Sequence, residues 1–347
     1  MTYLITGGAG FIGSHLVEYL LSKGEQVIVI DDLSTGSVTN LLHLKSNPKL
    51  ECHYETIFDR NLLAELVDQS DVIYHLAAAV GVRLIIERPV HTIETNVKGT
   101  ERVLHAAAKK GKPVFIASTS EVYGKNTHGI FREDDDLVLG STSKCRWGYA
   151  ASKAVDEFLA LAYCRQNKLP VTIGRFFNTV GPRQTARYGM VLPTFINQAV
   201  ANAPITIFGT GKQSRCFGYV GEVVEAIYRL MHSASAIGQV VNIGNDQEVT
   251  IEELAMLIRD RVGSNSQIDY IPYDAAYESG FEDMFRRKPC LDRLEKLTGF
   301  RPSMKVAEIV DRVLESLPGS RSALPPVMMP HVQSSHSISL SASAGSD

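Results

Sequence analysis

The sequence predicts an α/β protein with a doubly wound parallel sheet and a smaller α/β lobe toward the C-terminus. Short apolar runs of strand length alternate with longer segments patterned as helices, and the clearest runs are residues 2–6, 26–30, 71–76 and 113–118. Such alternation is typical of a parallel sheet with helices on both faces. We therefore expect the sheet in residues 1–175, completed by later segments that return to it, and the smaller lobe mainly in residues 176–317.

Local signals mark a late helix and the C-terminal tail. Thr250 and Glu253 have the spacing of a capping box, which predicts the start of a helix. From Pro318 onward the chain is rich in Ser, Pro and Ala and has no apolar periodicity. Such a segment cannot bury enough apolar surface to become ordered. We expect residues 318–347 to be disordered.

Composition narrows the class of protein. The 347 residues carry a formal net charge of −3 without a basic run interleaved with aromatics, so nucleic acid is not an expected partner. The five cysteines are scattered without metal-ligand spacing, which predicts reduced thiols and no metal site. No signal peptide precedes the first strand, and no apolar run approaches the ~20 residues needed to cross a bilayer. We expect a cytoplasmic protein without a membrane partner.

A glycine-rich turn joins the first strand to the first helix. Gly7 and Gly10 let the backbone turn tightly and approach a pyrophosphate, and Gly13 lets the helix pack closely on the strand. The start of the helix offers backbone N–H groups to the same anion. Asp31 ends the second strand, where its carboxylate can accept both hydroxyl groups of an adenosine ribose. No arginine follows closely to bind a 2′-phosphate, so the sequence predicts NAD on a Rossmann-type sheet.

Tyr149 and Lys153 form a candidate catalytic pair. Their i, i+4 spacing places both side chains on one face of a helix. A phenol is a weak base at neutral pH because its reference pKa is about 10, but a nearby ammonium group lowers that pKa. The carboxyl ends of the strands, where residues 77–79 and 118–121 fall, form the expected ligand crevice. The pair indicates proton transfer with a substrate hydroxyl.

Together these features resemble the extended short-chain dehydrogenase/reductases that modify nucleotide sugars, over roughly residues 1–317. Later signatures of that family are also present: His75-Leu76-Ala77-Ala78, Asn96, Arg175-Phe176-Phe177-Asn178, Gly181-Pro182-Arg183, Gly211-Lys212-Gln213-Ser214-Arg215 and Val241-Asn242-Ile243-Gly244-Asn245. Thr56 stands where many relatives have an aspartate that touches the adenine, and Glu222 stands where an aspartate is common. We assign no role to Glu222.

The resemblance implies the residues that contact the cofactor. The expected NAD contacts are Gly7, Gly10, Phe11, Ile12, Gly13, Asp31, Asp32, Thr56, Ile57, Leu76, Ala77, Ala78, Asn96, Ser118, Tyr149 and Lys153. Lys153 would bind the nicotinamide ribose and also lower the pKa of the tyrosine.

The resemblance also implies a first chemical step. Tyr149, as a phenolate, takes the proton of the sugar 4-hydroxyl while a hydride leaves C4 for the nicotinamide, and Thr119 holds the same oxygen. A 4-ketosugar results. The expected catalytic residues are Thr119, Ser120, Glu121, Tyr149 and Lys153.

Glu121 indicates the fate of that 4-ketosugar. In the family, simple 4-epimerases usually have a small Ser or Thr here, whereas decarboxylases and 4,6-dehydratases have glutamate. Ser120 stands where dTDP-glucose dehydratases have an aspartic acid, which weakens the case for dehydration, although GDP-mannose dehydratases share Thr-Ser-Glu. Decarboxylation needs less from the protein, because a C5 carboxylate beside a C4 ketone loses carbon dioxide once the enolate is stabilised.

The favoured function is therefore a UDP-glucuronate decarboxylase that forms UDP-xylose or its 4-keto precursor. A 4-epimerase of UDP-glucose or UDP-glucuronate remains open, as does a nucleotide-sugar 4,6-dehydratase. The resemblance alone implies that the nucleotide is UDP. Similar enzymes form homodimers through the helix that carries Tyr149 and the helix after Asn96, which predicts a homodimer here.

Arginines are the expected substrate contacts. Arg146 and Arg287 are the candidates for the substrate carboxylate, and Arg215 resembles the diphosphate-binding arginine of the family. Asn178 and Arg183 complete the expected set.

Structural explanations for several of these residues remain open. Arg146 could instead pair with a glutamate at the helix start, Arg287 could bind diphosphate, and Glu121 could be a buried structural acid. Trp147 is expected to be a packing residue, and His75 is expected to be a hydrogen-bonded structural histidine.

Overall fold

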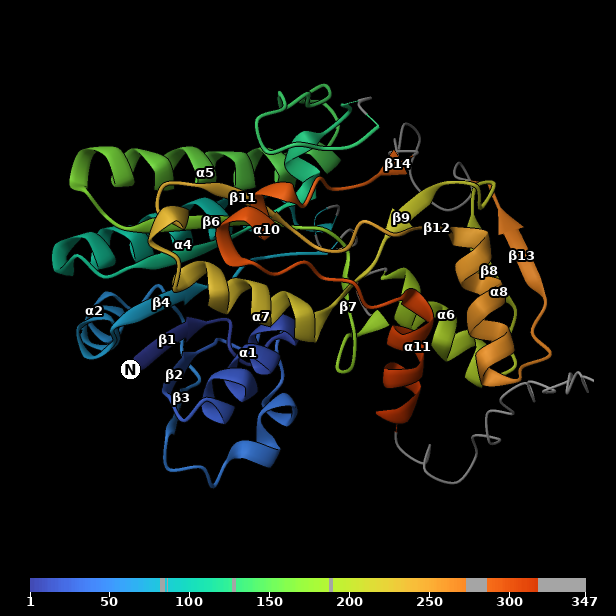
Figure 1. Cartoon of the computed structure of the whole chain (residues 1–347), viewed down its shortest axis with the longest axis horizontal. Coiled ribbons are helices and arrows are strands. Elements are labelled where there is room, and N and C mark those ends of the chain that lie inside the picture. Colours follow the sequence, from blue (N-terminus) through green and yellow to red (C-terminus); the bar gives the residue numbers. More distant parts are fainter. Residues whose placement is uncertain (82–84, 86, 127–128, 187–189, 273–285, 318–347) are drawn as a thin grey trace, which may run out of the picture.

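The computed structural model in Figure 1 shows a broad sheet with helices on both faces and a smaller lobe beside it. The structure describes residues 1–81, 85, 87–126, 129–186, 190–272 and 286–317. The predicted disordered tail, residues 318–347, lies outside the described residues.

A seven-stranded parallel sheet forms the centre of the molecule. Its strands in spatial order are β11 (Val240–Ile243), β6 (Val171–Phe176), β5 (Val114–Thr119), β4 (Val72–His75), β1 (Thr2–Thr6), β2 (Gln26–Ile30) and β3 (Leu50–His53). The order reverses between β1 and β4, which places the expected ligand crevice beyond their carboxyl ends. The doubly wound sheet is confirmed, and β11 is a later segment that returns to it.

Helices cover both faces of the sheet (Figure 1). One face packs against α1 (Phe11–Ser22), α7 (Val220–Met231) and α10 (Asp292–Thr298). The other face packs against α2 (Arg60–Gln69), α4 (Pro89–Lys110) and α5 (Arg146–Asn167). Within β1, Tyr3 and Ile5 belong to the first core cluster and Leu4 to the second. Both faces of the strand are therefore buried, which explains its continuous apolar sequence.

The smaller lobe has its own apolar core. It contains α6 (Val191–Val200), α8 (Ile251–Val262) and α11 (Val306–Glu315), with the parallel pair β8 (Ile205–Phe208) and β13 (Ile268–Ile271). The capping box that opens α8 is confirmed, because the Thr250 hydroxyl accepts from the Glu253 N–H and the Glu253 carboxylate accepts from the Thr250 N–H.

Short elements connect the lobe to the main sheet. They are β7 (Thr179–Val180) with β10 (Gly218–Tyr219), and β9 (Ser214–Cys216) between β12 (Glu248–Thr250) and β14 (Arg286–Arg287). Single 3₁₀ turns are η1 (Val38–Asn40), η2 (Leu42–Leu44), η3 (Ser120–Tyr123) and η5 (Ala234–Ala236). Across the described residues, no helix combines the length and apolar character needed to cross a membrane.

Candidate functional site

The turn between β1 and α1 contains close approaches that only glycine permits. Gly7 has a φ of +75°, and a Cβ atom there would lie 2.7 Å from the backbone nitrogen of Ala77. A Cβ atom on Gly13 would lie 2.2 Å from the carbonyl oxygen of Gly7. Gly10 caps α1 without a side chain, so the start of the helix is open to an anion. The turn therefore fits the pyrophosphate of a dinucleotide.

Asp31 is fixed at the end of β2. Its carboxylate accepts the backbone N–H of Ala9 at 2.9 Å and that of Leu33 at 2.8 Å. Burial raises the pKa of Asp31, and these two hydrogen bonds oppose that shift. Each carboxylate oxygen can accept more than one hydrogen bond, so Asp31 can also accept ribose hydroxyls. The crevice thus fits both the pyrophosphate and the adenosine ribose of NAD.

The loop after β4 is held by Asn96. The buried Asn96 amide accepts the Ala79 N–H at 2.8 Å and donates to the Ser152 hydroxyl at 3.2 Å. Asn96 therefore ties this loop to α5 through contacts that the sequence did not reveal. At the adenine end, the Thr56 hydroxyl accepts the Phe58 N–H at 3.2 Å. Six predicted contacts are at least partly buried around the crevice: Phe11, Ile12, Ile57, Leu76, Ala77 and Ala78.

His75 is a structural residue, as its position predicted. Its ring nitrogens lie 2.8 Å from the Thr6 hydroxyl and 3.2 Å from the Thr100 hydroxyl. Burial, with a smaller contribution from the Lys153 charge, lowers the pKa of His75 to about 3. The ring is therefore neutral at physiological pH.

Tyr149 lies inside α5 and close to the end of β5. Burial raises its pKa, the charges of Glu121 and Asp156 add to the shift, and a hydrogen bond with Thr119 opposes it. The contact with Thr119 brings together the two residues that the family resemblance assigned to one substrate oxygen. The pKa of Tyr149 is raised overall because burial is the largest contribution. That Lys153 lowers this pKa stays a prediction.

Lys153 has an anionic neighbour, Asp156. The Lys153 ammonium donates to the Asp156 carboxylate at 2.7 Å, and both side chains are buried. The ion pair lies within α5 at i, i+3 spacing. Burial raises the pKa of Asp156, and the Lys153 charge opposes that shift.

Glu121 lies between two arginines from distant parts of the chain. Its carboxylate is 3.1 Å from Arg287 of β14 and 3.9 Å from Arg146 at the start of α5. The sequence-based alternative in which Arg146 pairs with a glutamate is thus realised, and Arg287 shares the same acid. Arg146 and Tyr149 lie three residues apart on α5 and thus on one face of that helix, so this cluster and the tyrosine belong to one site.

The other predicted substrate residues lie at different places. The register of β9 and β14 sets the buried Arg215 opposite Arg287. The Asn178 amide donates to the Cys216 carbonyl at 3.2 Å. Arg183 donates to the Glu18 carboxylate at 2.5 Å and therefore joins the loop after β7 to α1. This contact does not involve the Glu121 cluster.

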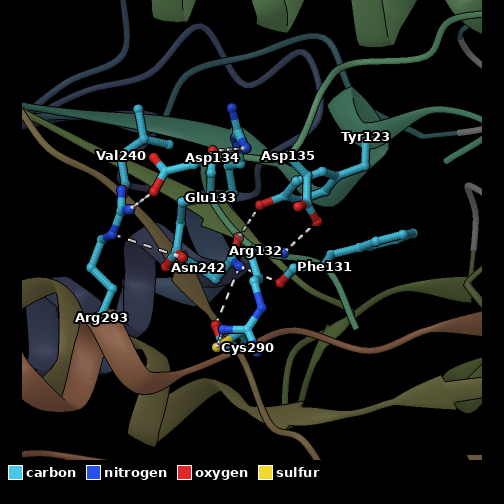
Figure 2. A network of polar contacts seen from close by, with 11 residues as sticks. Tyr123, Phe131, Arg132, Glu133, Asp134, Asp135, Val240, Asn242, Cys290 and Arg293 are labelled. Atoms are coloured by element: carbon cyan, nitrogen blue, oxygen red, sulfur yellow. Dashed lines mark hydrogen bonds and ion pairs between the residues drawn. The ribbon is translucent and has the colours of Figure 1, made fainter. Parts of the chain in front are cut away.

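A polar network joins Tyr123 of η3 to Cys290 through Asn242 (Figure 2). Glu121 lies in η3, and Arg287 lies three residues before Cys290. The Tyr123 hydroxyl donates to the Asn242 side chain at 2.7 Å. The Asn242 amide donates to the carbonyls of Phe131 and Cys290 at 3.0 and 3.2 Å, so η3, β11 and the segment after β14 meet at one residue. The Glu133 carboxylate accepts the Asn242 N–H at 3.0 Å.

A second buried network lies beneath the end of β5. The Glu157 carboxylate binds Arg175 through both oxygens, at 2.9 and 2.8 Å, and accepts the Ser118 hydroxyl at 2.5 Å. Ser118, a predicted cofactor contact, therefore uses its hydroxyl to position β5 against α5. Trp147 is a packing residue as predicted, because Gly140 lies directly against its indole ring.

Sequence reasoning missed Asp156, Glu157 and Asn242 as parts of this site. All three are buried polar residues. A signal was present for each, because the two acids follow Lys153 in a helix and Asn242 lies in a family signature. Their partners could not be named without the tertiary structure. Within the described residues, no cluster of His, Cys, Asp or Glu could hold a metal ion.

Curated relatives are nucleotide-sugar enzymes. The chain is 43% identical to UDP-N-acetyl-alpha-D-glucosaminuronate decarboxylase of Bacillus cytotoxicus. The match spans 302 residues, which is 87% of this chain and 92% of that protein. The chain is 35% identical to UDP-glucuronic acid decarboxylase 1 of Arabidopsis thaliana, over 90% of this chain and 68% of that protein.

Solved structures agree with the fold. UDP-glucuronic acid 4-epimerase from Bacillus cereus, in complex with UDP-glucuronic acid and NAD, superposes with a TM-score of 0.82 at 26% identity and covers 91% of this chain and 98% of that chain. dTDP-glucose 4,6-dehydratase from Streptomyces venezuelae, with NAD bound, has a TM-score of 0.82 at 30% identity, over 91% of this chain and 96% of that chain.

A family model also matches most of the chain. The model described as the NAD dependent epimerase/dehydratase family matches residues 3–244. The predictions of an enzyme, of NAD as its cofactor and of nucleotide-sugar chemistry are confirmed. This chain belongs to the NAD dependent epimerase/dehydratase family.

Proposed function

We propose that this protein is an NAD-dependent decarboxylase of a UDP-linked uronate, either UDP-glucuronate or its 2-acetamido form. The observation that carries the proposal is the convergence of Arg287 and Arg146 on one point beside Tyr149. Among the described residues, Arg287 Nε is buried and has no hydrogen-bond acceptor, so it can donate to an incoming anion. A uronate carboxylate is an anion of the required charge and geometry.

The residues support a chemical sequence that removes this carboxylate. Tyr149 accepts the proton of the sugar 4-hydroxyl, and Thr119 orients the same oxygen. NAD, when bound, would accept the hydride from C4 at this point. Arg287 and Arg146 hold the C6 carboxylate while the C5–C6 bond breaks, so that carbon dioxide leaves and its electron pair passes to the C4 enolate. A proton then adds to C5.

The cofactor and the nucleotide occupy opposite sides of the same crevice in this proposal. The glycine turn and Asp31 hold the pyrophosphate and the adenosine ribose of NAD, and Lys153 lies on the nicotinamide side. The lobe of residues 176–317 holds the nucleotide sugar, with Arg215 and Asn178 toward its diphosphate. The Rossmann-type domain is residues 1–175 together with returning segments such as β11.

A 4-epimerase is the second candidate. One observation favours it: Glu121 already faces both arginines, which leaves the substrate carboxylate to compete with an internal acid. In an epimerase the arginines would serve only to hold Glu121 in place. The 4-keto intermediate would then be reduced from its opposite face without loss of carbon.

We also propose a cytoplasmic homodimer that pairs through α4 and α5. Large apolar side chains are exposed along these two neighbouring helices, most of all Val90 at 69% and Phe158 at 68%. Ile93 and Val155 extend the same exposed set. Exposed apolar residues gathered on adjacent helices are typical of a subunit interface. Sedimentation of the purified protein checks the dimer.

A substrate panel tests the proposed reaction. The purified protein is incubated with NAD and, separately, with UDP-glucuronate, UDP-N-acetylglucosaminuronate and UDP-glucose, and the products are identified by mass spectrometry. We expect a UDP-pentose or its 4-keto form from one of the uronates and no change in UDP-glucose. Interconversion of UDP-glucose and UDP-galactose without loss of carbon from any uronate would support the epimerase instead.

A further inference from the structure

A carboxylate lies beside the lysine of the catalytic pair, inside the protein. Lys153 and Asp156 are 2.7 Å apart, and their side chains are 3% and 0% exposed. Removing two charges from water is costly, and apolar residues of similar size often stabilise a protein at least as well as a buried ion pair. A contribution to the stability of the fold therefore does not explain this ion pair.

The surroundings identify Asp156 as the specific partner of Lys153. Glu157, the next acid on α5, is bound through both oxygens to Arg175. His75 of β4 faces the lysine but is neutral, because burial lowers its pKa to about 3.

The remaining titratable and polar groups lie on neighbouring elements. Glu121 of η3 acts on Tyr149 and is paired with Arg287 and Arg146. Thr100 of α4 stabilises the ionised form of Asp156 by a hydrogen bond. Asp156 is thus the acid whose charge offsets the Lys153 ammonium.

We infer that Asp156 is a positioning residue that fixes the Lys153 ammonium and sets the lowest pH at which Tyr149 can accept a proton from the substrate. An unpaired ammonium would stabilise the phenolate of Tyr149 strongly. Asp156 cancels part of that effect and confines the lysine to one side of the crevice. This inference deepens the proposed function and rests on Tyr149 being the base of that reaction.

The sign of the effect follows from the charges. The Asp156 carboxylate raises the pKa of Tyr149, in the same direction as burial and Glu121. A base acts in its deprotonated form, so a higher pKa moves the acidic limb of the rate to higher pH. Asp156→Asn keeps the size of the side chain and removes its charge. The acidic limb should therefore move to lower pH, by about 1 unit.

The test measures hydride transfer in a single turnover as a function of pH, with saturating NAD and a UDP-uronate. We compare the wild type with Asp156→Asn, with Asp156→Glu, and with Glu94→Gln, which removes one exposed negative charge paired with Lys98 on α4. We expect the limb to move only in Asp156→Asn. An unchanged limb in folded Asp156→Asn would overturn the inference. If that variant does not fold, Asp156→Ser, which leaves room for water beside Lys153, replaces it with the same expectation.

A readout without substrate separates this inference from the proposed function. The ionisation of Tyr149 is followed by tyrosinate absorbance in the NAD-bound protein, as the difference between each protein and its Tyr149→Phe counterpart. Asp156→Asn should titrate about 1 unit lower than the wild type. A lower titration without oxidation of any uronate would support Asp156 and reject the proposed reaction. Oxidation of a uronate with an unchanged titration would do the reverse.

Discussion

The cofactor side and the substrate side of the crevice are built in different ways. The cofactor side uses the backbone of one continuous stretch, from Gly7 to Asp31, in which missing side chains create the space. The substrate side uses long charged side chains from separate elements, and the contact between Arg287 and Glu121 spans 166 positions of the sequence. Binding of a common cofactor can thus depend on local sequence, whereas the choice of reaction depends on tertiary structure.

The largest expected effect concerns the point where the two sides meet. Tyr149→Phe removes the phenolate oxygen that accepts the substrate proton, so hydride transfer should fall by roughly 10³-fold while NAD still binds. Stopped-flow absorbance of reduced nicotinamide measures the rate. Tyr163→Phe, on the same helix, is the matched control and should retain the wild-type rate. Equal rates in wild type and Tyr149→Phe would remove the tyrosine from the mechanism.

Two adjacent arginines of β14 test the substrate side. Arg287→Ala removes the guanidinium beside Glu121 and should lower kcat/KM for the uronate by about 100-fold, which is about 2.7 kcal/mol. Arg286→Ala removes an exposed guanidinium that pairs with Glu248 and should change kcat/KM less than 2-fold, as expected of an exposed pair. Steady-state kinetics measure kcat/KM for both variants. A similar loss in both variants would mean that β14 matters only for folding.

Two glycines with left-handed backbone test the cofactor side. Gly7→Ala places a Cβ atom against Ala77, so the Kd for NAD should rise by about 10-fold or more. Gly111→Ala has a similar φ of +65° but meets nothing within 4 Å. It should cost about 1 kcal/mol of stability and leave NAD binding unchanged. Calorimetric titration with NAD measures the Kd of both variants. Weak binding of NAD by Gly111→Ala would show that backbone strain, and not contact with the added Cβ atom, controls the affinity.

The smallest expected effect concerns the network in Figure 2. Asn242→Ala removes the amide that donates to the carbonyls of Phe131 and Cys290, and among the described residues only the Phe131 carbonyl keeps another donor, the Cys290 N–H. The free energy of unfolding should fall by about 2 kcal/mol. Because the network joins the segments that carry Glu121 and Arg287, kcat/KM should fall while NAD affinity stays constant. Denaturant unfolding and NAD titration measure the two quantities. The control is Asn197→Ala at an exposed position of α6, and loss of NAD affinity in Asn242→Ala alone would contradict the separation of the two sides.

Much of the fold and of the cofactor side could be predicted from the sequence. The alternation of apolar strands with helices is a local pattern. Gly7, Gly13 and Asp31 lie in one continuous stretch of the sequence. The capping box at Thr250 is equally local, and the structure contains it. In each case the residues that interact lie close together in the sequence, so their spacing alone carries the information.

The substrate side could be predicted only in part. The sequence named Glu121, Arg146 and Arg287, but it did not show that the acid lies between the two arginines. Likewise it named Lys153 without Asp156, although the two are close in the sequence. The reason is that an acid near a lysine on a helix is usually a solvated pair, and only the packing of α5 shows that this one is buried.

The most direct test of the central claim uses UDP-glucuronate and UDP-N-acetylglucosaminuronate, each labelled at the C6 carboxyl carbon. Each is incubated with the NAD-bound wild type and with Arg287→Ala, and labelled carbon dioxide is collected. The wild type should release the label from one of the two uronates, and Arg287→Ala should release it about 100-fold more slowly. Turnover of a uronate with complete retention of the label in the nucleotide sugar would contradict the account.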